Sequence, residues 1–209
     1  KLNGRKRMIH LYSATISQEI RDLANDLLHD YALISIGEPG SGKKDITQYI
    51  DFTKQSNRTD KTIELLEKFK TPCLIFVNHK VDTDRLAKAI EKKRWKSAAM
   101  HGGKSQDKRE DILDSFKKGK VDVLVCTNVL ARGIDVEGVK QVINYDCPKI
   151  FSDYIHRIGR TGRAGKSGIA TTFMSQENSD LFADLKKFLE SNDQRVPKEL
   201  NKVEDDRMG

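Results

Sequence analysis

The run from His156 to Arg163 gathers three cations and two glycines within eight residues. At helical spacing, His156, Arg160 and Arg163 fall on one face, because they stand at positions i, i+4 and i+7. A solvated basic face does not explain the two glycines, each of which costs a helix up to about 1 kcal/mol relative to alanine. Cations this close repel one another, and an incoming phosphate relieves that repulsion. The run therefore predicts close approach to a phosphate ligand or another backbone, with an ordinary solvated face as the alternative.

A second polar group follows an apolar run over residues 121–126. Thr127, Gly133 and Asp135 come just after the strand predicted there. In open parallel sheets, ligands bind beyond the carboxyl ends of the strands. A carboxylate can accept hydrogen bonds from ribose hydroxyls, while a threonine hydroxyl and backbone amides can meet phosphate. The position of this group favours a sugar-phosphate ligand over an ordinary polar loop.

A third group follows a weak strand predicted over 97–100. Gly102 and the glycine after it permit close backbone approach. The next helix, with Ser105 as its N-cap, offers unpaired amides to an anion. Gln106 and Arg109 lie three residues apart and share one face of that helix. Both a phosphate contact and a tight turn before a solvated basic helix fit this pattern.

A fourth stretch resembles a nucleotide-binding loop. Gly37-Glu-Pro-Gly-Ser-Gly-Lys43 fits the first seven positions of a P-loop, but Lys44 stands where the Mg²⁺-binding hydroxyl belongs. A P-loop also leads into a helix whose amides hold the phosphate, whereas residues 45–53 alternate in polarity as a strand does. These differences favour a glycine-rich linker. A kinase or ATPase that uses Gly37–Lys44 stays open as an alternative.

Short apolar runs alternate with helical patterns through most of the chain. Strands are predicted over 73–77, 97–100, 121–126, 141–145 and 169–174, in addition to 45–53. This alternation predicts an α/β fold, with a mostly parallel sheet covered by helices on both faces. A strand over 7–12 and a helix capped by Ser17 precede this pattern and do not fit it.

The composition excludes few classes of protein. The formal charge of +7, from 38 Lys plus Arg against 31 Asp plus Glu, weakly favours a polyanionic partner. Cys73, Cys126 and Cys147 lack metal-binding spacing, so buried reduced thiols are expected and no metal site. No apolar run approaches the roughly 18 residues of a membrane span, and no signal peptide opens the chain. We therefore expect no membrane partner and a reducing compartment, either cytosol or nucleus.

Together these stretches resemble the second RecA-like domain of a DEAD-box RNA helicase. The corresponding elements are Ser13-Ala-Thr15 for motif III, Ile75-Phe-Val-Asn78 for motif IV, Gln106-x-x-Arg109 between motifs IV and V, Thr127–Asp135 for motif V, and His156–Arg163, letter for letter, for motif VI. The resemblance covers nearly the whole chain and implies a RecA-like, P-loop NTPase-like fold without a P-loop of its own. The run after motif VI and the Val-Pro-x-Glu-Leu ending also resemble the spliceosomal branch that acts at the 5′ splice site.

The resemblance implies four segments. Residues 1–36 are expected to be the end of a first RecA-like domain, including motif III, and 37–45 a linker between domains. Residues 46–190 are expected to form the second RecA-like domain, and 191–209 a polar tail. The Q-motif, the true P-loop and the Asp-Glu-Ala-Asp box of the family do not occur in these residues and belong to the first domain.

The resemblance also implies a role for each candidate side chain. In the family, ATP and RNA bind across the cleft between two RecA-like domains, with Mg²⁺ held by the first. The residues expected to act on the nucleotide are Asp135, Gly133 and the two arginine fingers Arg160 and Arg163, which are also the expected catalytic groups. Those expected to hold the RNA backbone are Gly102, Gln106, Arg109, Thr127 and Gly133, and those expected to couple the two sites are Ser13, Thr15 and His156.

Several partners follow from the same resemblance. They are single-stranded or duplex RNA, the first RecA-like domain and, on the splicing interpretation, spliceosomal proteins in the nucleus. The chain alone is expected to hydrolyse ATP negligibly. The strand over 7–12, without its native sheet, is expected to be disordered or to pair with another copy in a strand-swapped oligomer. A non-enzymatic RNA-binding module stays open as an alternative, and a DNA helicase of related fold is a weaker one.

Overall fold

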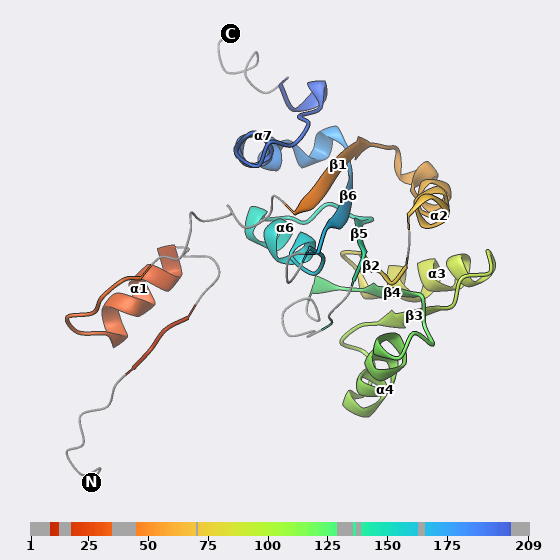
Figure 1. The fold of residues 1–209 in the computed structure, drawn as a ribbon, viewed down its shortest axis with the longest axis horizontal. Helices are drawn as coiled ribbons and strands as arrows, with labels where there is room; N and C mark the ends of the chain where they lie inside the picture. The colour runs from red at the N-terminus through yellow and green to blue at the C-terminus, as the bar shows by residue number, and fades with distance from the viewer. Residues whose placement is uncertain are drawn as a thin grey trace. The chain divides into compact units, whose positions relative to one another are not determined.

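The structure is a computed structural model in which residues 9–12, 18–34, 45–69, 71–128, 136, 139–162 and 166–201 are described. The chain divides into two compact units, residues 1–42 and 43–209 (Figure 1). In the first unit, helix α1 spans Gln18–Leu27. Its Ala24 is buried, whereas Leu23 and Leu27 are exposed. Ser17, the expected N-cap, lies outside the described residues.

The strand predicted over 7–12 is not formed in the part of it that the structure describes. Residues 9–12 are extended without belonging to any strand, and Ile9, Leu11 and Tyr12 are exposed. A strand needs a hydrogen-bonded neighbour, and a single extended segment has none. The sheet that would pair with this segment is not among the described residues, so pairing with another copy stays a prediction.

The second unit is built on one sheet of six parallel strands. The strands are β1 (Ile46–Phe52), β2 (Cys73–Phe76), β3 (Ser97–Met100), β4 (Val123–Cys126), β5 (Gln141–Asn144) and β6 (Gly168–Met174). Their order across the sheet is β1-β6-β5-β2-β4-β3, and every pair is parallel. The predicted α/β class and parallel sheet are confirmed, and the fold is RecA-like.

Helices cover both faces of this sheet (Figure 1). They are α2 (Arg58–Lys68), α3 (Lys80–Glu91), α4 (Gln106–Lys117), α6 (Phe151–Ile158) and α7 (Phe182–Ser191), with short 3-10 turns at Gln55–Asn57, Gln176–Leu181 and Lys198–Asn201. Alternate strand residues divide between two cores: Cys73 and Ile75 pack with α2 and α3, whereas Leu74 and Phe76 pack with α4, α6 and α7. Because both faces are buried, the central strands β2 and β4 are continuous apolar runs.

Strand β1 follows the run that resembles a P-loop and shows what kind of element comes after it. Residues 37–44 themselves lie outside the described residues, but β1 begins at Ile46, directly after Asp45. Ile46 and Gln48 are buried, whereas Tyr49 is exposed, as the alternation predicted. A P-loop continues into a helix whose amides hold the phosphate. The strand found here removes that anion site.

The segment after α7 packs on the second unit as far as residue 201. Leu200 is buried in the core, and the backbone N–H of Gln48 on β1 donates to Oε1 of Gln194 at 2.9 Å. The sequence had suggested a polar tail from residue 191, and Leu200 was not recognised as a core residue. One leucine in a polar run has no periodicity that would reveal it.

Candidate functional site

The predicted site residues that the structure describes come from segments that follow the carboxyl ends of the strands. This end of the sheet is called the edge below. β3 and β4 pair side by side with Met100 opposite Cys126. Gly102 and Thr127 therefore follow the carboxyl ends of neighbouring parallel strands. Gln106 and Arg109 lie in the first turns of α4, which begins at the same edge. This is the edge at which ligands bind in open α/β sheets.

His156 and Arg160 come from the segment that follows β5. His156 lies on α6, and Arg160 comes just after that helix. The other predicted site residues lie outside the described part of the chain, so their roles stay predictions. They are Ser13, Thr15, Gly133, Asp135 and Arg163.

A hydrogen-bonded group fixes the turn that contains Gly102. The backbone N–H of Gly103 donates to Nδ1 of His101 at 3.1 Å, so this ring nitrogen carries no proton. The other ring nitrogen, Nε2, then carries the proton and donates to Asp84 on α3 at 2.9 Å. Lys104 donates to the second oxygen of the same carboxylate at 3.2 Å. Both ends of the Gly102–Gly103 turn are thereby tied to one helix.

The charge of Asp84 suits this role. Burial acts to raise the pKa of its carboxyl, but the hydrogen bonds from Lys104 and His101 outweigh it and hold the pKa below its ordinary value. The carboxylate is therefore ionised at neutral pH and accepts from both partners. Sequence inspection missed Asp84, since nothing in its spacing on α3 relates it to the turn.

Gly102 itself is exposed, and a Cβ added to it would meet no atom within 4 Å. Its backbone conformation is also not one that requires glycine. Nothing among the chain's own described atoms therefore requires a glycine here. A ligand that lies against the turn would supply that requirement, because a side chain would hold its backbone away.

Arg109 and Gln106 differ in how they are held. Nε of Arg109 is buried and has no hydrogen-bond partner among the described residues. A buried charged donor without an acceptor is unfavourable, and a phosphate oxygen would satisfy it. Gln106, in contrast, is exposed and donates from Nε2 to Glu110 at 2.6 Å. Ser105 accepts from the backbone N–H of Lys108 at 3.4 Å, which confirms it as the N-cap.

We expect Gly102→Ala to fold as the parent chain does and to bind single-stranded RNA at least tenfold more weakly, a loss of about 1.4 kcal/mol. The added methyl group has open space in the protein but would stand between the turn and an RNA backbone. Fluorescence anisotropy with a labelled oligouridylate measures the affinity, and thermal unfolding checks the fold. Gly119→Ala is not a suitable control because Gly119 has a positive φ of 69°. Ala98→Gly, within β3 and before its carboxyl end, serves as the control instead. An unchanged affinity of Gly102→Ala for RNA would contradict the expectation.

The arrangement of motif VI differs from the predicted helical face. α6 ends at Ile158 with Gly159 as its C-cap, so Arg160 lies beyond the helix. Nε of Arg160 donates to the backbone oxygen of His156 at 3.3 Å. Thr161 then pairs with Val139 in an isolated bridge, which draws the chain away from the helix axis. The prediction of one helical face was therefore wrong, because Gly159 ends the helix.

Gly162 is required by the protein's own backbone. Its φ is 64°, and a Cβ would stand 2.4 Å from a side-chain carbon of Ile46 on β1. The sequence predicted close approach to a backbone or to a ligand. For Gly162 the first alternative holds.

Arg157, which the sequence analysis passed over, forms a network of hydrogen bonds at this edge. It is 1% exposed and donates to Asn128 Oδ1 at 2.5 Å, to Asn78 Oδ1 at 2.9 Å and to the backbone oxygen of Asp146 at 2.7 Å. A longer bond of 3.4 Å reaches Asn144 Oδ1. Burial lowers the pKa of the guanidinium, and nearby acidic groups oppose that shift. At neutral pH it remains charged.

The partners of Arg157 end three different strands. Asn78 follows β2, Asn128 follows β4 and Asn144 closes β5, so one guanidinium ties three neighbouring strand ends to α6. Asn128 also donates to Asp153 of α6 at 2.6 Å. Because Thr127 and the run after it begin beside Asn128, this network positions the start of motif V relative to motif VI. Arg157 is a positioning residue rather than a ligand contact.

A signal for Arg157 was present in the sequence. Tyr154 and Ile158 are apolar residues four apart on one helix face, and Arg157 stands at i+3 from the first. Helical spacing therefore places it on the buried face, beside the asparagines that end the apolar runs. A second ion pair supports the same edge: Arg58 of α2 donates to Asp146 at 3.2 Å, and both side chains are largely buried.

The three cysteines are buried thiols, as predicted. Burial raises the pKa of Cys73, and it raises the pKa of Cys126 and Cys147 to about 12. In the part of the chain that the structure describes, no three His, Cys, Asp or Glu side chains come together as a metal site would require. None of the described helices combines the length and the apolar character needed to cross a membrane.

Comparison with known protein families shows which family this domain belongs to. Residues 57–165, more than half of the chain, match the family model described as "Helicase conserved C-terminal domain". The chain belongs to this family. The matched region contains the Gly102 turn, the start of α4, Thr127 and motif VI. This helicase C-terminal domain is of the DEAD-box RNA helicase type, as its relatives show.

The relatives are DEAD-box proteins in sequence and in structure. The chain is 42% identical over 196 residues to the human protein named probable ATP-dependent RNA helicase DDX23, covering 93% of this chain and 24% of that protein. The structure of the yeast DEAD-box splicing factor Prp28 matches with a TM-score of 0.73 and 31% identity, over 91% of this chain and 43% of that one. Dbp5 of S. cerevisiae, bound to RNA and ADP BeF3, matches with a TM-score of 0.72 and 30% identity, over 92% and 52%.

The helicase C-terminal domain is a part of such proteins. The chain spans about a quarter to a third of the length of curated relatives such as DDX23 and the DEAD-box RNA helicase 35A of rice. The activity of a whole relative is therefore a property of more residues than are present here.

Proposed function

We propose that this domain is the second half of an ATP-dependent RNA helicase and completes an ATP and RNA site on a first RecA-like domain. The observation that carries the proposal is the edge described above, where the Gly102 turn and Thr127 follow the neighbouring ends of β3 and β4, with Arg109 on α4 and Arg160 just after α6. Dbp5, a relative of the same fold, was solved with RNA and ADP BeF3. Both ligands carry phosphates, which backbone amides of the Gly102 turn and the half-buried guanidinium groups of Arg109 and Arg160 could bind.

The proposed RNA contacts lie on the β3 and β4 side of the edge. Gly102 lets the sugar-phosphate backbone approach the turn, and Arg109 and Gln106 add side-chain donors from α4. Thr127 contributes a hydroxyl at the end of β4, and Gly133 after it is assigned to the same surface. Contacts of this kind are made to phosphate and sugar, so we expect little preference for base sequence.

The proposed nucleotide contacts lie on the motif V and motif VI side. Asp135, with Gly133, would accept from ribose hydroxyls, while Arg160 and Arg163 reach the γ-phosphate of ATP held by the first domain. The charge that develops on the transferred phosphoryl group is stabilised by such arginines. Mg²⁺ is assigned to the first domain, together with the P-loop and the acidic box. His156, Ser13 and Thr15 are assigned to coupling between the nucleotide and the RNA.

The proposal also assigns the segments of the chain, its cellular role and its compartment. Residues 1–36 would complete the first RecA-like domain, 37–45 would link the two, and 46–190 would form the second, followed by 191–209. Similarity to DDX23 and to the yeast splicing factor Prp28 supports a role in pre-mRNA splicing, and hence in the nucleus, with spliceosomal partners. A cytoplasmic RNA-remodelling role is the alternative.

Strand displacement tests the proposal directly. The chain is fused behind the first RecA-like domain of a DEAD-box helicase and mixed with a short fluorescent RNA duplex carrying a single-stranded overhang. We expect ATP-dependent release of the labelled strand and none from a DNA duplex of the same sequence. Binding without release would favour the non-enzymatic RNA-binding module, and release from DNA alone would favour a DNA helicase.

A further inference from the structure

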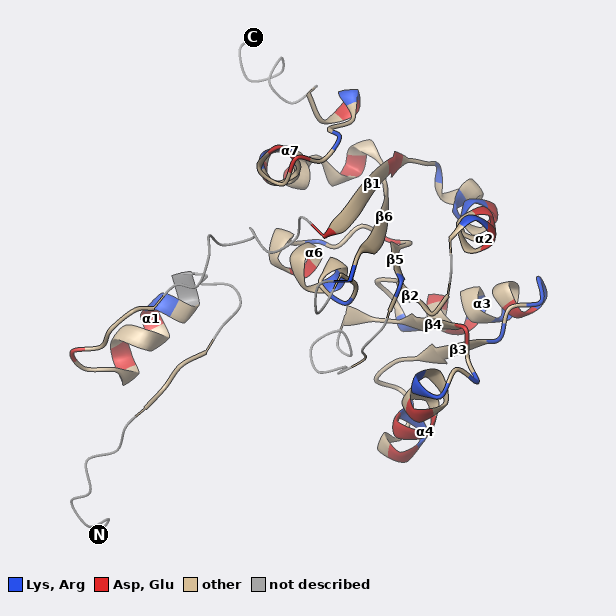
Figure 2. Cartoon of the chain, in the orientation of Figure 1, with Lys and Arg blue, Asp and Glu red and all other residues tan. Residues whose placement is uncertain are grey.

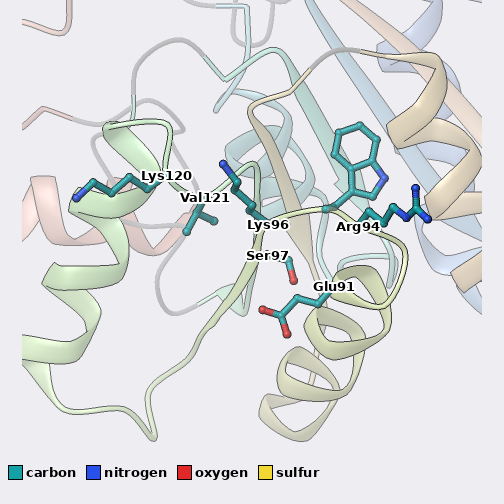
Figure 3. Close-up of a pocket in the computed structure, with 7 residues that line it drawn as sticks. Glu91, Arg94, Lys96, Ser97, Lys120 and Val121 are labelled. Atoms are coloured by element: carbon teal, nitrogen blue, oxygen red, sulfur yellow. The ribbon is translucent and has the colours of Figure 1, made fainter.

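A basic hollow lies at the opposite ends of two strands that reach the candidate site. It has a volume of about 460 Å³ and is lined by the loops that precede β3 and β4 (Figure 3). Arg94, Trp95 and Lys96 line it from the first loop and Lys120 from the second, with Glu91 at the end of α3. It is no part of the edge described above, since that edge is formed by the carboxyl ends of the same strands.

The two loops carry an unusual concentration of positive charge. The loop after α3 and the turn after α4 are coloured by Lys and Arg in Figure 2. The cations are Lys92, Lys93, Arg94, Lys96, Lys117, Lys118 and Lys120, against the carboxylates of Glu91, Asp114 and Asp122. All seven cations are exposed. A surface of this kind attracts polyanions.

Helix ends explain only part of this charge. Lys117 and Lys118 stand at the end of α4, where cations interact favourably with the helix dipole, and Lys118 is paired with Asp114 at 2.7 Å. Arg94, Lys96 and Lys120 lie beyond the helix ends, and none of them forms an ion pair with a described carboxylate. The charges that line the hollow therefore have no structural partner in the described part of the chain.

Arg94 occupies a position at which glycine is the usual residue. Its φ is 71°, in the left-handed region, while Gly119 takes a φ of 69° in the turn that ends α4. The two turns thus reverse the chain in the same way, but one does so with glycine and the other with arginine. A non-glycine residue in this region is strained by about 1 kcal/mol or more. The strain is accepted at the position that brings a guanidinium to the hollow.

Trp95 adds an aromatic group to these cations. It is half-buried, packs partly on the core beneath α2 and α3, and also lines the hollow. Cations that track a backbone, combined with aromatic rings on which bases stack, are the features of single-stranded nucleic-acid surfaces. Only Val121 adds further apolar lining, so the deep apolar pocket that anchors a protein partner is missing from the hollow.

We infer that this hollow is a second RNA-binding surface, which takes a single-stranded segment beyond the one held at the candidate site. β3 is the outermost strand of the sheet, so no other strand separates the two surfaces on that side. β3 and β4 have four residues each and therefore span only about 13 Å between their ends. The choice of RNA as the polyanion rests on the proposed function, whereas the unpaired charges of the hollow do not.

Trp95 makes the test specific, because it is the single tryptophan of the chain. Its fluorescence is recorded while an oligouridylate is added to the 209-residue chain, and saturable quenching is expected as a base stacks on the ring. Lys96→Glu with Lys120→Glu should abolish the quenching. Lys54→Glu with Lys187→Glu changes the charge equally on exposed residues elsewhere and should leave it intact. Removing two phosphate contacts should also reduce the salt slope of log K by about 1.4.

Arg94→Gly guards against a variant that merely misfolds. It removes both the strain and one cation, so the melting temperature should rise while RNA binding at Trp95 weakens severalfold. If the melting temperature and the RNA affinity of Arg94→Gly both rise, the inference is overturned. Unchanged quenching in the Lys96→Glu, Lys120→Glu chain would overturn it too. Quenching by polyglutamate equal to or greater than that by the oligouridylate would overturn it as well, since the hollow would then fit an acidic protein.

Gly102→Ala separates this inference from the proposed function. In the Lys96→Glu, Lys120→Glu chain, the anisotropy of labelled RNA reports the candidate site alone, and if the proposed function holds, adding Gly102→Ala weakens that binding. In the otherwise unchanged chain, Gly102→Ala leaves the quenching of Trp95 in place. If Gly102→Ala leaves the anisotropy unchanged, the assignment of the candidate site fails, and the fluorescence of Trp95 still decides the hollow independently.

Discussion

Replacing Arg160 with alanine is expected to lower RNA-stimulated ATP hydrolysis about 10³- to 10⁵-fold when the chain is joined to a first RecA-like domain. Arg160 lies just past α6, where the bond from its Nε to the backbone oxygen of His156 holds the guanidinium beside the end of the helix. An arginine so held can stabilise charge on the γ-phosphate without paying much entropy at the moment of reaction. Steady-state ATPase rates with saturating RNA measure the loss.

Two further variants make the result for Arg160 interpretable. Arg160→Lys keeps the charge but not the planar fork of donors, so it should recover only a small part of the rate. Arg195→Ala removes an exposed arginine from the segment after α7 and should have no effect. A rate for Arg160→Ala within about threefold of the parent, which is less than 1 kcal/mol, would exclude an arginine finger at this position.

The second large effect is expected in stability. Arg157→Ala should lower the free energy of unfolding by about 3–5 kcal/mol, because it leaves buried acceptors of Asn78, Asn128 and Asp146 without their donor. A loss of this size is a large fraction of the 5–15 kcal/mol typical of a folded domain. Urea unfolding followed by circular dichroism measures it.

The contrast with an exposed arginine tests the reason for that effect. Arg85 of α3 pairs with Asp82 at 2.7 Å, but its side chain is 72% exposed. Exposed ion pairs contribute about 0–1 kcal/mol, so Arg85→Ala should change the free energy of unfolding by no more than that. Arg157→Lys puts all its donors on one nitrogen and cannot replace the bonds made separately by Nε, Nη1 and Nη2, so it should resemble Arg157→Ala. Equal effects of Arg157→Ala and Arg85→Ala would show that the network does not hold the strand ends together.

The sheet was predictable because its strands are buried on both faces. Runs such as Cys73–Phe76 and Val123–Cys126 are apolar at every position, and the structure confirms them. α2 was missed because two of its four buried residues are Arg58 and Thr62, so the apolar periodicity is broken. Arg58 can be buried because tertiary partners satisfy it: it donates to Tyr145 O and to Asp146, while Thr62 donates to the backbone oxygen of Arg58 within the helix. No local pattern contains that information.

Some local features of the candidate site were predictable, but contacts between distant elements were not. The glycine turn at Gly102 and the N-cap at Ser105 are local features, and both were recognised. Asp84 and Arg157 act across elements that are distant in sequence, through bonds to His101 and to Asn128. The prediction that motif VI forms one helical face failed at Gly159, where the helix ends. This end depends on the bridge that Thr161 forms with Val139, which the local sequence does not reveal.

ATP hydrolysis shows whether this domain supplies half of an ATP site, as proposed. It is measured with RNA in three samples: the chain alone, a first RecA-like domain of a DEAD-box helicase alone, and the two together. We expect RNA-stimulated hydrolysis only in the mixture, with Lys43→Ala unchanged, because β1 follows the P-loop-like run where a helix would be needed. Robust hydrolysis by the chain alone that Lys43→Ala abolishes would contradict the account, and so would a mixture no more active than its parts.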